Sequence, residues 1–313
     1  MQPTAHFPVP YRGPAGRRRT LHGKRKDEDV NVTGGFKERF LRVVSYPWPL
    51  RLALARAVLR RVPLFSYADR LSIGAVMWPY YGYCIYHAAR LATALGYPRI
   101  SVIEFGCGGG NGLVAAERHI AEIARLFPIE IELYGFDTGA GLPPPRDYRD
   151  MPHYFQGGLY RMDRRALEQK LTRAALVIGD VKETCRRFFA EHGAAPVGCM
   201  LHDLDYYSST RDALALFDAG PAHFLPRVFI YFDDVIGDET WLCNDYAGER
   251  LAITEFNRDH ADQKIAPIPS LPIQFPSRWA HQVYIRHDFA HPRYNDFVGA
   301  AQQRSHQDAI QLR

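Results

Sequence analysis

Short apolar runs alternate with helical stretches along most of this chain, from about residue 84 onward. The runs are rich in β-branched and aromatic residues, and each is followed by a stretch with helical periodicity. This alternation is typical of an α/β protein with a doubly wound, mostly parallel sheet, because helices connect parallel neighbours and cover both faces. We predict strands at 100–105, 129–136, 175–178, 197–201, 227–232 and 282–286, and helices at 85–95, 113–126, 164–171, 182–192, 209–217 and 249–259.

The segments outside this alternation have a different composition. Residues 1–35 are rich in Pro, Gly and charge, which predicts a disordered basic arm. A helical N-terminal extension follows, and its helix at 50–61 is both basic and apolar. This helix either packs on the main domain, which we favour, or lies on a membrane surface. The predicted divisions are therefore 1–35, 36–83, 84–286 for the main domain and 287–313 for a C-terminal tail.

The net charge of +5 is unevenly distributed. Residues 1–26 contain seven Lys and Arg and no acid, so the rest of the chain carries −2. A body with this balance is not expected to bind nucleic acid, and any affinity for polyanions belongs to the arm. Methylation of nucleic acid through the arm is therefore an unfavoured alternative.

Hydropathy and cysteine usage bear on the compartment. No apolar run approaches the ~18 residues of a membrane span, and no apolar segment of a signal peptide precedes the arm. The five cysteines are scattered and odd in number, which fits neither a disulfide framework nor a zinc site. We therefore predict a protein of the reducing cytoplasm without a transmembrane segment.

Ligands of such sheets bind at the carboxyl ends of the strands, and the first strand ends in a glycine-rich turn. The turn follows Glu104 and has glycine at three alternate positions, which lets the backbone approach a bound molecule closely. A dinucleotide fingerprint would need glycine at position 111, where this chain has Asn111, so a dinucleotide-dependent oxidoreductase is disfavoured. The three glycines are Gly106, Gly108 and Gly110.

Single acids follow the second and third strands. Asp137 ends the second strand, where its carboxylate can accept hydrogen bonds from both hydroxyls of a ribose. Asp180 follows the third strand, where it can meet an adenine amino group. A helix begins directly after Asp180, so a role as the helix N-cap is an almost equal alternative.

Four carboxylates follow the fourth and fifth strands, which should be neighbours in the sheet. In a partly buried cleft they would repel one another, and a divalent cation would remove that repulsion. Oxygen ligands without cysteine or paired histidine favour magnesium, calcium or manganese over zinc. The alternative is that these acids are solvated turn formers and helix caps. The four are Asp203, Asp205, Asp233 and Asp234.

Together these motifs resemble the macrocin O-methyltransferase family, which belongs to the class I S-adenosylmethionine-dependent methyltransferases. The resemblance covers about residues 98–286 and rests on the glycine turn, the GFD and GLP segments within 135–143, segment 179–184, the run from Asp203 to Thr210, and the Asp pair at 233–234. It implies a seven-stranded Rossmann-like fold, S-adenosylmethionine bound at the strand ends named above, and magnesium. It also implies metal ligation by Asp203, Asp233 and Asp234, with Asp205 as the general base.

The chemistry that the resemblance implies is methyl transfer to a hydroxyl of a sugar or another small-molecule acceptor. A cation lowers the pKa of a bound hydroxyl, and a nearby base then removes its proton. Asp205 is the favoured base. The family commonly has glycine where this chain has Leu204, and this departure leaves the identity of the base open, so His202 is the alternative. A non-catalytic S-adenosylmethionine-binding or partner-binding protein on the same fold is the rival hypothesis. A homo-oligomer is compatible with the sequence.

Overall fold

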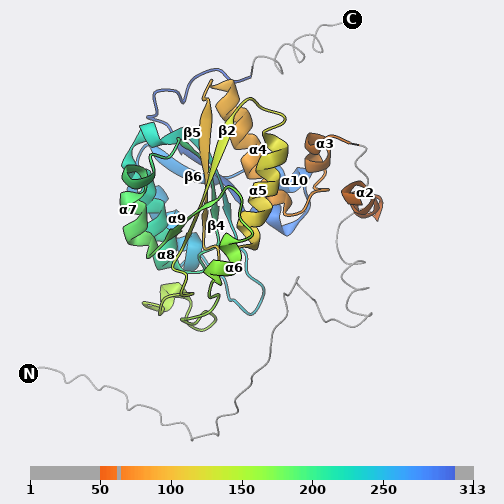
Figure 1. Cartoon of the computed structure of the whole chain (residues 1–313). Helices are drawn as coiled ribbons and strands as arrows, with labels where there is room; N and C mark the ends of the chain where they lie inside the picture. The colour runs from red at the N-terminus through yellow and green to blue at the C-terminus, as the bar shows by residue number, and fades with distance from the viewer. Residues whose placement is uncertain (1–49, 62–64, 300–313) are drawn as a thin grey trace, which may run out of the picture. The chain divides into compact units, whose positions relative to one another are not determined.

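The computed structural model describes residues 50–61 and 65–299 (Figure 1). The predicted arm, residues 36–49 and residues 300–313 lie outside this part of the chain. Within the described residues, seven strands form one sheet in the order β3-β2-β1-β4-β5-β7-β6. The strands are β1 (Arg99–Phe105), β2 (Glu130–Asp137), β3 (Ala175–Ile178), β4 (Val197–His202), β5 (Phe224–Phe232), β6 (Gln263–Pro267) and β7 (Val283–Asp288).

The sheet is mostly parallel, as predicted. Strand β1 pairs in parallel with β2 and with β4, and β4 pairs in parallel with β5. Strand β7 is antiparallel to both of its neighbours, β5 and β6. The chain moves outward from β1 to β3 on one side and from β4 onward on the other, so the carboxyl ends of β1 and β4 lie side by side. Ligands of such folds bind at this reversal of strand order.

Helices cover both faces of the sheet, which confirms the doubly wound fold (Figure 1). Helices α4 and α5 pack on one face together with α10, and α7, α8 and α9 pack on the other. The described helices are α2 (Leu50–Arg61), α3 (Tyr67–Ser72), α4 (Pro79–Ala94), α5 (Asn111–Ile123), α6 (Arg164–Glu168), α7 (Val181–His192), α8 (Tyr207–Leu214), α9 (Gly248–Asp259) and α10 (Leu271–Gln274).

One helix and one strand extend across the expected borders of the main domain. Helix α4 begins at Pro79 rather than at residue 85 and packs on β4 and β5, so the border after residue 83 falls inside one helix. Strand β7 continues to Asp288, and the backbone amide of Phe289 donates to the Asp262 carbonyl oxygen at 2.8 Å. The start of the predicted tail is therefore part of the main domain.

Helix α2 occupies the predicted range, and one of its basic side chains is directed toward protein rather than solvent. The Arg56 side chain is buried, and its Nε donates to the carbonyl oxygen of Ile73. This contact joins α2 to the segment after α3, within the N-terminal extension, and packing of α2 on the main domain stays a prediction. Leu54 and Val58 on the same helix are exposed.

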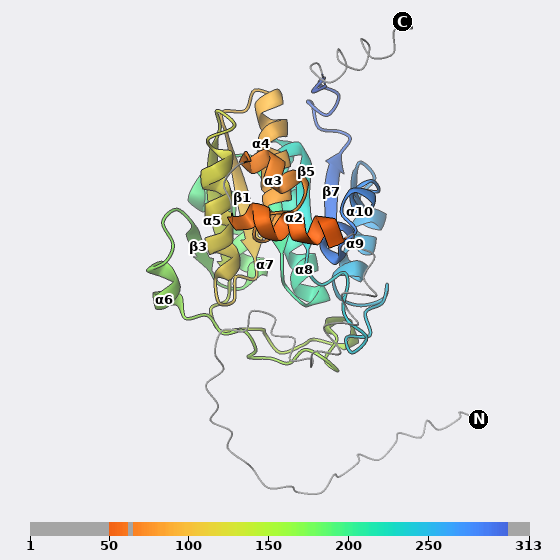
Figure 2. The ribbon, with the colours of Figure 1, turned by 90° about the vertical axis from the view of Figure 1, so that its right-hand side faces the viewer.

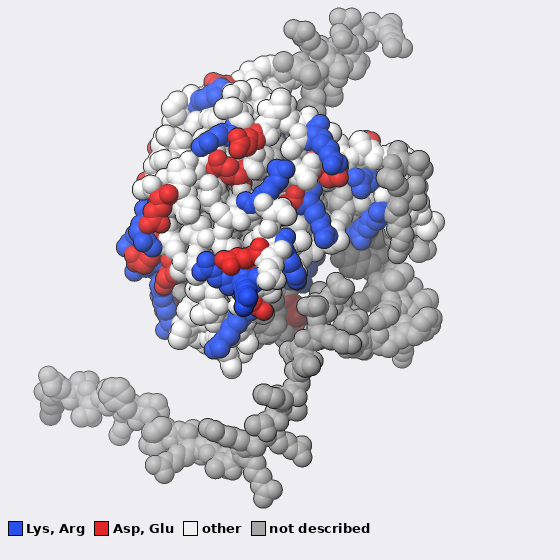
Figure 3. Space-filling model, in the orientation of Figure 1, with Lys and Arg blue, Asp and Glu red and all other residues white. Residues whose placement is uncertain are grey.

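The remaining features of the surface concern membranes and polyanions. Among the described helices, none combines the length and the apolar character that a membrane crossing requires. Lys and Arg side chains are interspersed with Asp and Glu on the face shown in Figure 3, so charges of both signs occupy it.

The loops that follow β2 and β5 lie at the same end of the sheet, beyond the carboxyl ends of the strands (Figure 2).

Candidate functional site

The glycine turn after β1 is in close contact with the segment after β4. Gly106 has a φ of +81°, and a methyl group there would lie 1.7 Å from the carbonyl oxygen of Asp203. The amide of Asp203 in turn donates to the carbonyl oxygen of Phe105 at 3.0 Å. Only glycine permits both the positive φ and this approach. The turn therefore joins the two strand ends at which ligand-binding residues were predicted.

Glu104, the last acid of β1, is buried beneath this turn. Its Oε1 accepts a hydrogen bond from the Tyr81 hydroxyl at 3.1 Å, whereas its Oε2 is buried without a partner. A methyl group at Gly112 would lie 1.9 Å from Oε1, so the start of α5 presses directly on the carboxyl group. Burial, and to a smaller extent Asp137, raises the pKa of Glu104 to about 8, although the bond from Tyr81 opposes this shift.

Asp137 holds the glycine turn in place. Its Oδ2 accepts from the Gly108 amide at 2.9 Å, and its Oδ1 accepts from the Gly139 amide at 2.6 Å. The carboxylate is half-buried at the end of β2, next to the turn. It therefore already orders the backbone that the sequence analysis assigned to cofactor binding.

Asp180 is the N-cap of α7, which was the alternative considered for it. Its Oδ1 accepts from the Lys182 amide at 2.9 Å, and the residue is exposed at the end of β3. Oδ2 is not used by the cap. A contact with an adenine amino group is compatible with this geometry and stays a prediction.

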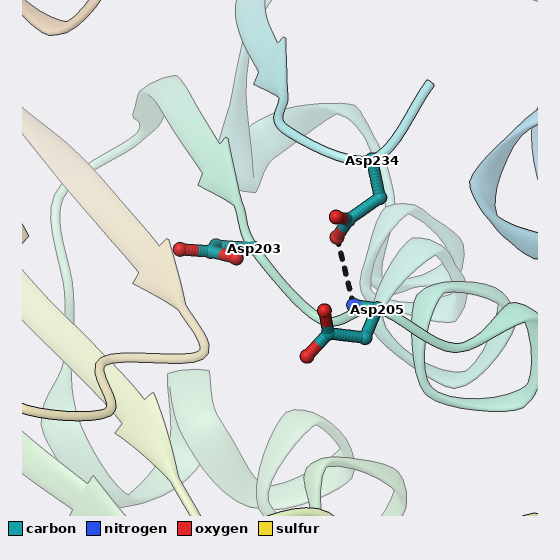
Figure 4. Close-up of side chains that lie close together, drawn as sticks. All are labelled: Asp203, Asp205 and Asp234. Atoms are coloured by element: carbon teal, nitrogen blue, oxygen red, sulfur yellow. Dashed lines mark hydrogen bonds between the residues drawn. The ribbon is translucent and has the colours of Figure 1, made fainter. Parts of the chain in front are cut away.

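Three carboxylates from two strand ends form one group, to which we refer as the carboxylate group (Figure 4). Asp203 and Asp205 follow β4, Asp234 follows β5, and one oxygen from each lies within 4.8 Å of the others. Asp234 Oδ2 accepts from the Asp205 amide at 2.9 Å, and Asp205 has a φ of +59°. Burial, followed by repulsion from neighbouring carboxylates that include Asp233, raises the pKa values of the buried Asp205 and Asp234.

Asp233 lies outside the carboxylate group, although the predicted metal ligands were Asp203, Asp233 and Asp234. Its Oδ1 accepts from the Tyr231 hydroxyl at 2.5 Å, and its carbonyl oxygen accepts from the Gln282 side chain at 2.6 Å. The structure therefore adds Asp205 to Asp203 and Asp234, while Asp233 lies near enough for its charge to raise the pKa of Asp203. Ligation of a cation by Asp233 stays a prediction.

His202 lies inside the protein core. The side chain is fully buried, its ring centroid lies 4.9 Å from that of Phe105 and 4.7 Å from that of Phe232, and neither ring nitrogen has a hydrogen-bond partner. Burial lowers the pKa of His202 to about 3. Successive side chains of a strand point to opposite faces, so His202 faces away from the side that Asp203 occupies. This placement removes the alternative base proposed from the sequence.

Glu249 is a residue of the site region that the sequence analysis missed. It lies in the first turn of α9 and is fully buried, and its Oε2 accepts from the Asp234 amide at 2.9 Å. Its Oε1 and the Oδ1 of Asp234 are both buried without a partner. Burial, followed by repulsion from Asp234, raises the pKa of Glu249 well above its usual range. No motif marks this position, because an acid at a helix start is ordinarily an exposed residue.

Tyrosine side chains border the carboxylates on two sides. The ring of Tyr80 stacks on that of Tyr231 with 4.3 Å between centroids, and burial with Asp233 and Asp203 nearby raises the pKa of Tyr80. Tyr160, in the loop after β2, has a φ of +59°, and its Cβ lies 3.9 Å from a methyl group placed on Gly108. Burial, followed by Asp205, raises the pKa of Tyr160 to about 12. Tyr160 therefore lies near both the glycine turn and the carboxylate group.

The donor set and its surroundings fit a hard divalent cation. All three donors are carboxylate oxygens, which are the ligands that magnesium prefers. Asp205 and Asp234 are buried, and Asp234 keeps one oxygen without a hydrogen-bond partner among the described residues. A cation would offset both the repulsion and the lost solvation.

No model of a protein family matches the sequence, and no curated protein matches it either, so the macrocin family is not confirmed as its family. Among solved structures, the chain is similar to CalS11, a calicheamicin methyltransferase, with 19% identity, a TM-score of 0.49, and coverage of 86% of this chain and 99% of that one. It is also similar to the O-methyltransferase NovP, with 14% identity, a TM-score of 0.42, and coverage of 65% and 78%. A third is MycE, a methyltransferase of the mycinamycin pathway solved with Mg, SAH and mycinamycin VI, with 14% identity, a TM-score of 0.39, and coverage of 91% and 69%.

Proposed function

We propose that this chain is a class I S-adenosylmethionine-dependent O-methyltransferase that uses a divalent cation, Mg²⁺ in the first place, and acts on a hydroxyl of a small-molecule acceptor. The observation that supports this proposal most is the direct contact of Gly106 with the Asp203 carbonyl oxygen. It joins a glycine turn suited to a cofactor to a carboxylate group suited to a cation. A methyltransferase needs these two sites next to each other, because methyl carbon and acceptor oxygen must meet.

On the cofactor side, the turn and the strand ends offer acceptors for a nucleoside and an amino acid. Asp137, which accepts from the Gly108 amide, would also accept from the ribose hydroxyls, and the Oδ2 of Asp180 that the helix cap leaves unused would accept from the adenine amino group. The unpartnered Oε2 of Glu104 is a further acceptor beneath the turn. Gly108 has a positive φ, and a methyl group there would meet only Tyr160, at 3.9 Å, so the backbone at Gly108 is open to a cofactor. At Gly110, which also has a positive φ, the Leu167 side chain fills the corresponding space.

On the acceptor side, Asp203 and Asp234 would hold the cation, with Asp205 as the third carboxylate of the group. Lowering the pKa of an aliphatic hydroxyl is the chemistry that a divalent cation supplies when it is bound. Asp205 then accepts the hydroxyl proton as the acceptor oxygen bonds to the methyl carbon and the carbon–sulfur bond breaks. The products are the methyl ether and S-adenosylhomocysteine. Tyr80 and Tyr160 border this space and would shape it.

The acceptor class follows from the resemblance to the macrocin O-methyltransferases, whose acceptors are sugar hydroxyls. Exposed aromatic and aliphatic side chains in the loops after β2 and β5 would contact such an acceptor, and these include Tyr148, Leu159, Leu242 and Tyr246. The loops lie at the carboxyl end of the sheet, where the carboxylate group is found (Figure 2).

Calorimetric titration tests the cofactor. S-adenosylhomocysteine and NAD are each titrated into the full chain, with and without Mg²⁺. We expect S-adenosylhomocysteine to bind and NAD to give no heat of binding. Tight NAD binding without a response to S-adenosylhomocysteine would overturn the proposal, because the glycine turn would then serve a dinucleotide.

Two neighbouring substitutions test the metal site. Mn²⁺ binding is measured by electron paramagnetic resonance on the wild type, Asp234→Asn and Asp233→Asn. Asp234 belongs to the carboxylate group, so we expect its replacement to weaken Mn²⁺ binding by at least about 100-fold. Asp233 is bonded to Tyr231 outside the group, so its replacement is expected to have less than about a tenfold effect. A larger loss of Mn²⁺ affinity in Asp233→Asn than in Asp234→Asn would mean that Asp233 is a ligand and that the carboxylate group is not the cation site.

A further inference from the structure

A chain of two hydrogen bonds links helix α9 to the loop after β4 through the carboxylate group. Glu249 Oε2 accepts from the Asp234 amide at 2.9 Å, and Asp234 Oδ2 accepts from the Asp205 amide at 2.9 Å. Each acid therefore fixes the main chain of the next one. The two hydrogen bonds run from helix α9, across the end of β5, to the end of β4.

The last member of this chain needs such support. Asp205 has a φ of +59°, in the left-handed region that residues other than glycine rarely adopt. A backbone in that region costs about 1 kcal/mol or more and persists only when its surroundings hold it. The bond from the Asp205 amide to Asp234 is such a restraint, and the position of Asp234 depends in turn on its own amide bond to Glu249.

Glu249 is not an ordinary acid of a helix start. Acids in the first turn of a helix stabilise it through its dipole while exposed to water, whereas Glu249 is fully buried. In the part of the chain that the structure describes, no Lys, Arg or His forms an ion pair with it. Its Oε1 has no partner, and neither has the Oδ1 of Asp234, to which it is joined. Burying a carboxylate in this way is costly, and an apolar side chain would pack there at less cost.

We propose that Glu249 is a positioning residue of the carboxylate group: through the Asp234 amide it sets the geometry in which Asp203 and Asp234 would hold a divalent cation with Asp205 beside it. This inference rests on the proposed metal-assisted function. Glu249 acts as a hydrogen-bond acceptor for the main chain and does not itself ligate the cation. Its effect on the site passes through Asp234 and then Asp205.

The test uses Mn²⁺ as the probe and the full chain in four forms, namely wild type, Glu249→Gln, Glu249→Met and Glu255→Gln. Glutamine keeps a side-chain oxygen that can accept from the Asp234 amide, whereas methionine has nearly the same length without that acceptor. Glu255 lies on the same helix and accepts from the Tyr207 hydroxyl at 2.5 Å, so it is the matched control. Mn²⁺ affinity is measured by electron paramagnetic resonance, and thermal unfolding and S-adenosylhomocysteine binding are measured on the same samples.

We expect Glu249→Met to weaken Mn²⁺ binding about 10- to 100-fold, the range that outer partners of metal ligands usually show. Glu249→Gln should stay within about threefold of the wild type, and Glu255→Gln should be unchanged. S-adenosylhomocysteine affinity should be unaffected in all variants that fold, because the Glu249 bond lies on the β5 side of the site.

Each other result overturns the inference. Unchanged Mn²⁺ binding in Glu249→Met would make the bond to Asp234 irrelevant to the site. A loss in Glu249→Gln as large as in Glu249→Met would make the charge, and direct ligation, the function of the residue. If Glu249→Met does not fold, Glu249→Gln is the remaining test. It is predicted to bind Mn²⁺ nearly normally, and a large loss of Mn²⁺ affinity would overturn the inference. A wild type that binds S-adenosylhomocysteine but no Mn²⁺ would overturn both this inference and the metal-assisted part of the proposed function.

Discussion

The two halves of the carboxyl edge of the sheet hold their acids in opposite ways. At the ends of β2 and β3, the carboxylates of Asp137 and Asp180 accept hydrogen bonds from nearby backbone amides, and for Asp137 one of these is the Gly108 amide of the turn after β1. At the ends of β4 and β5, Asp203, Asp205 and Asp234 lie close together, and Asp234 keeps a buried oxygen without a partner. Asp137 and Asp180 are therefore compensated by the fold itself, whereas the carboxylate group carries charge that needs compensation.

This difference indicates how the two halves would bind their ligands. Amides that already orient Asp137 also fix the glycine turn, so the cofactor side is preorganised and little of it has to move. The carboxylate group is electrostatically unfavourable by itself, because burial and repulsion both favour the protonated acids. Its binding energy for a cation comes from removing that penalty. Substitutions at Gly106, Glu104 and Asp180, with Gly109 as a control, test these two sources of order.

The largest expected effect is at the junction of the halves. Gly106→Ala places a methyl group 1.7 Å from the carbonyl oxygen of Asp203 and gives alanine a φ of +81°. The main chain at the ends of β1 and β4 must then separate, and we expect a loss of at least about 3 kcal/mol in the free energy of unfolding. Urea denaturation of the two proteins measures this loss.

Gly109→Ala is the matched control in the same turn. A methyl group at Gly109 meets nothing within 4 Å, and its φ is not in the positive region. We expect a change within about 0.5 kcal/mol. Equal effects of the two substitutions would mean that the contact between the halves does not restrain them.

The strands near the centre of this edge could be predicted from the sequence, and the reason is their burial. Strand β4 is buried along its whole length and β1 is buried after its first residue, so both appear as nearly continuous apolar runs. Strand β6 was missed, because Ile265 is its only fully buried residue and Pro267 ends it. The sequence pattern is weak wherever a strand contributes little to the core.

The site was predictable down to the strand end but not to the individual carboxylate. Parallel strands bring Asp203 and the Asp233–Asp234 pair to one edge, which the alternation of elements already implies. Whether Asp233 or Asp234 turns toward Asp203 depends on the turn after β5 and on the hydroxyl of Tyr231, and neither leaves a mark in a linear pattern. The inward direction of His202 was available from strand alternation, because it shares the core face with Phe105 and Phe232.

The second effect concerns Glu104, the one acid of the cofactor half that keeps a buried unpartnered oxygen. Its pKa is raised to about 8 in the folded protein from an ordinary value of 4.5, so the native state binds the extra proton between these values. Stability therefore falls as the pH rises through this window, with a slope of about 1.4 kcal/mol per pH unit for one proton.

Glu104→Gln removes this titration. The free energy of unfolding of the variant minus that of the wild type should therefore increase by about 1.4 kcal/mol between pH 6 and pH 7. This increase is expected whatever the difference between the two proteins is at pH 6. Both are measured by urea denaturation in the presence of a chelator, so that no metal contributes. Parallel curves over this range would mean that Glu104 is already ionised, and that the cofactor half is as fully compensated as Asp137 suggests.

The smallest effect separates two roles of Asp180. Its Oδ1 caps α7 by accepting from the Lys182 amide, so Asp180→Ala should cost about 1 kcal/mol of stability. Asp180→Asn can keep that cap with its own Oδ1, and its stability should be close to that of the wild type.

The asparagine then presents an NH₂ group where the aspartate presents Oδ2. An adenine amino group is also a donor, so the Asn variant should bind S-adenosylhomocysteine about fivefold more weakly despite normal stability, which calorimetry measures. Unchanged affinity in Asp180→Asn would leave Asp180 as a helix cap alone, and the cofactor half would then depend on Asp137 and the glycine turn for recognition of the nucleoside.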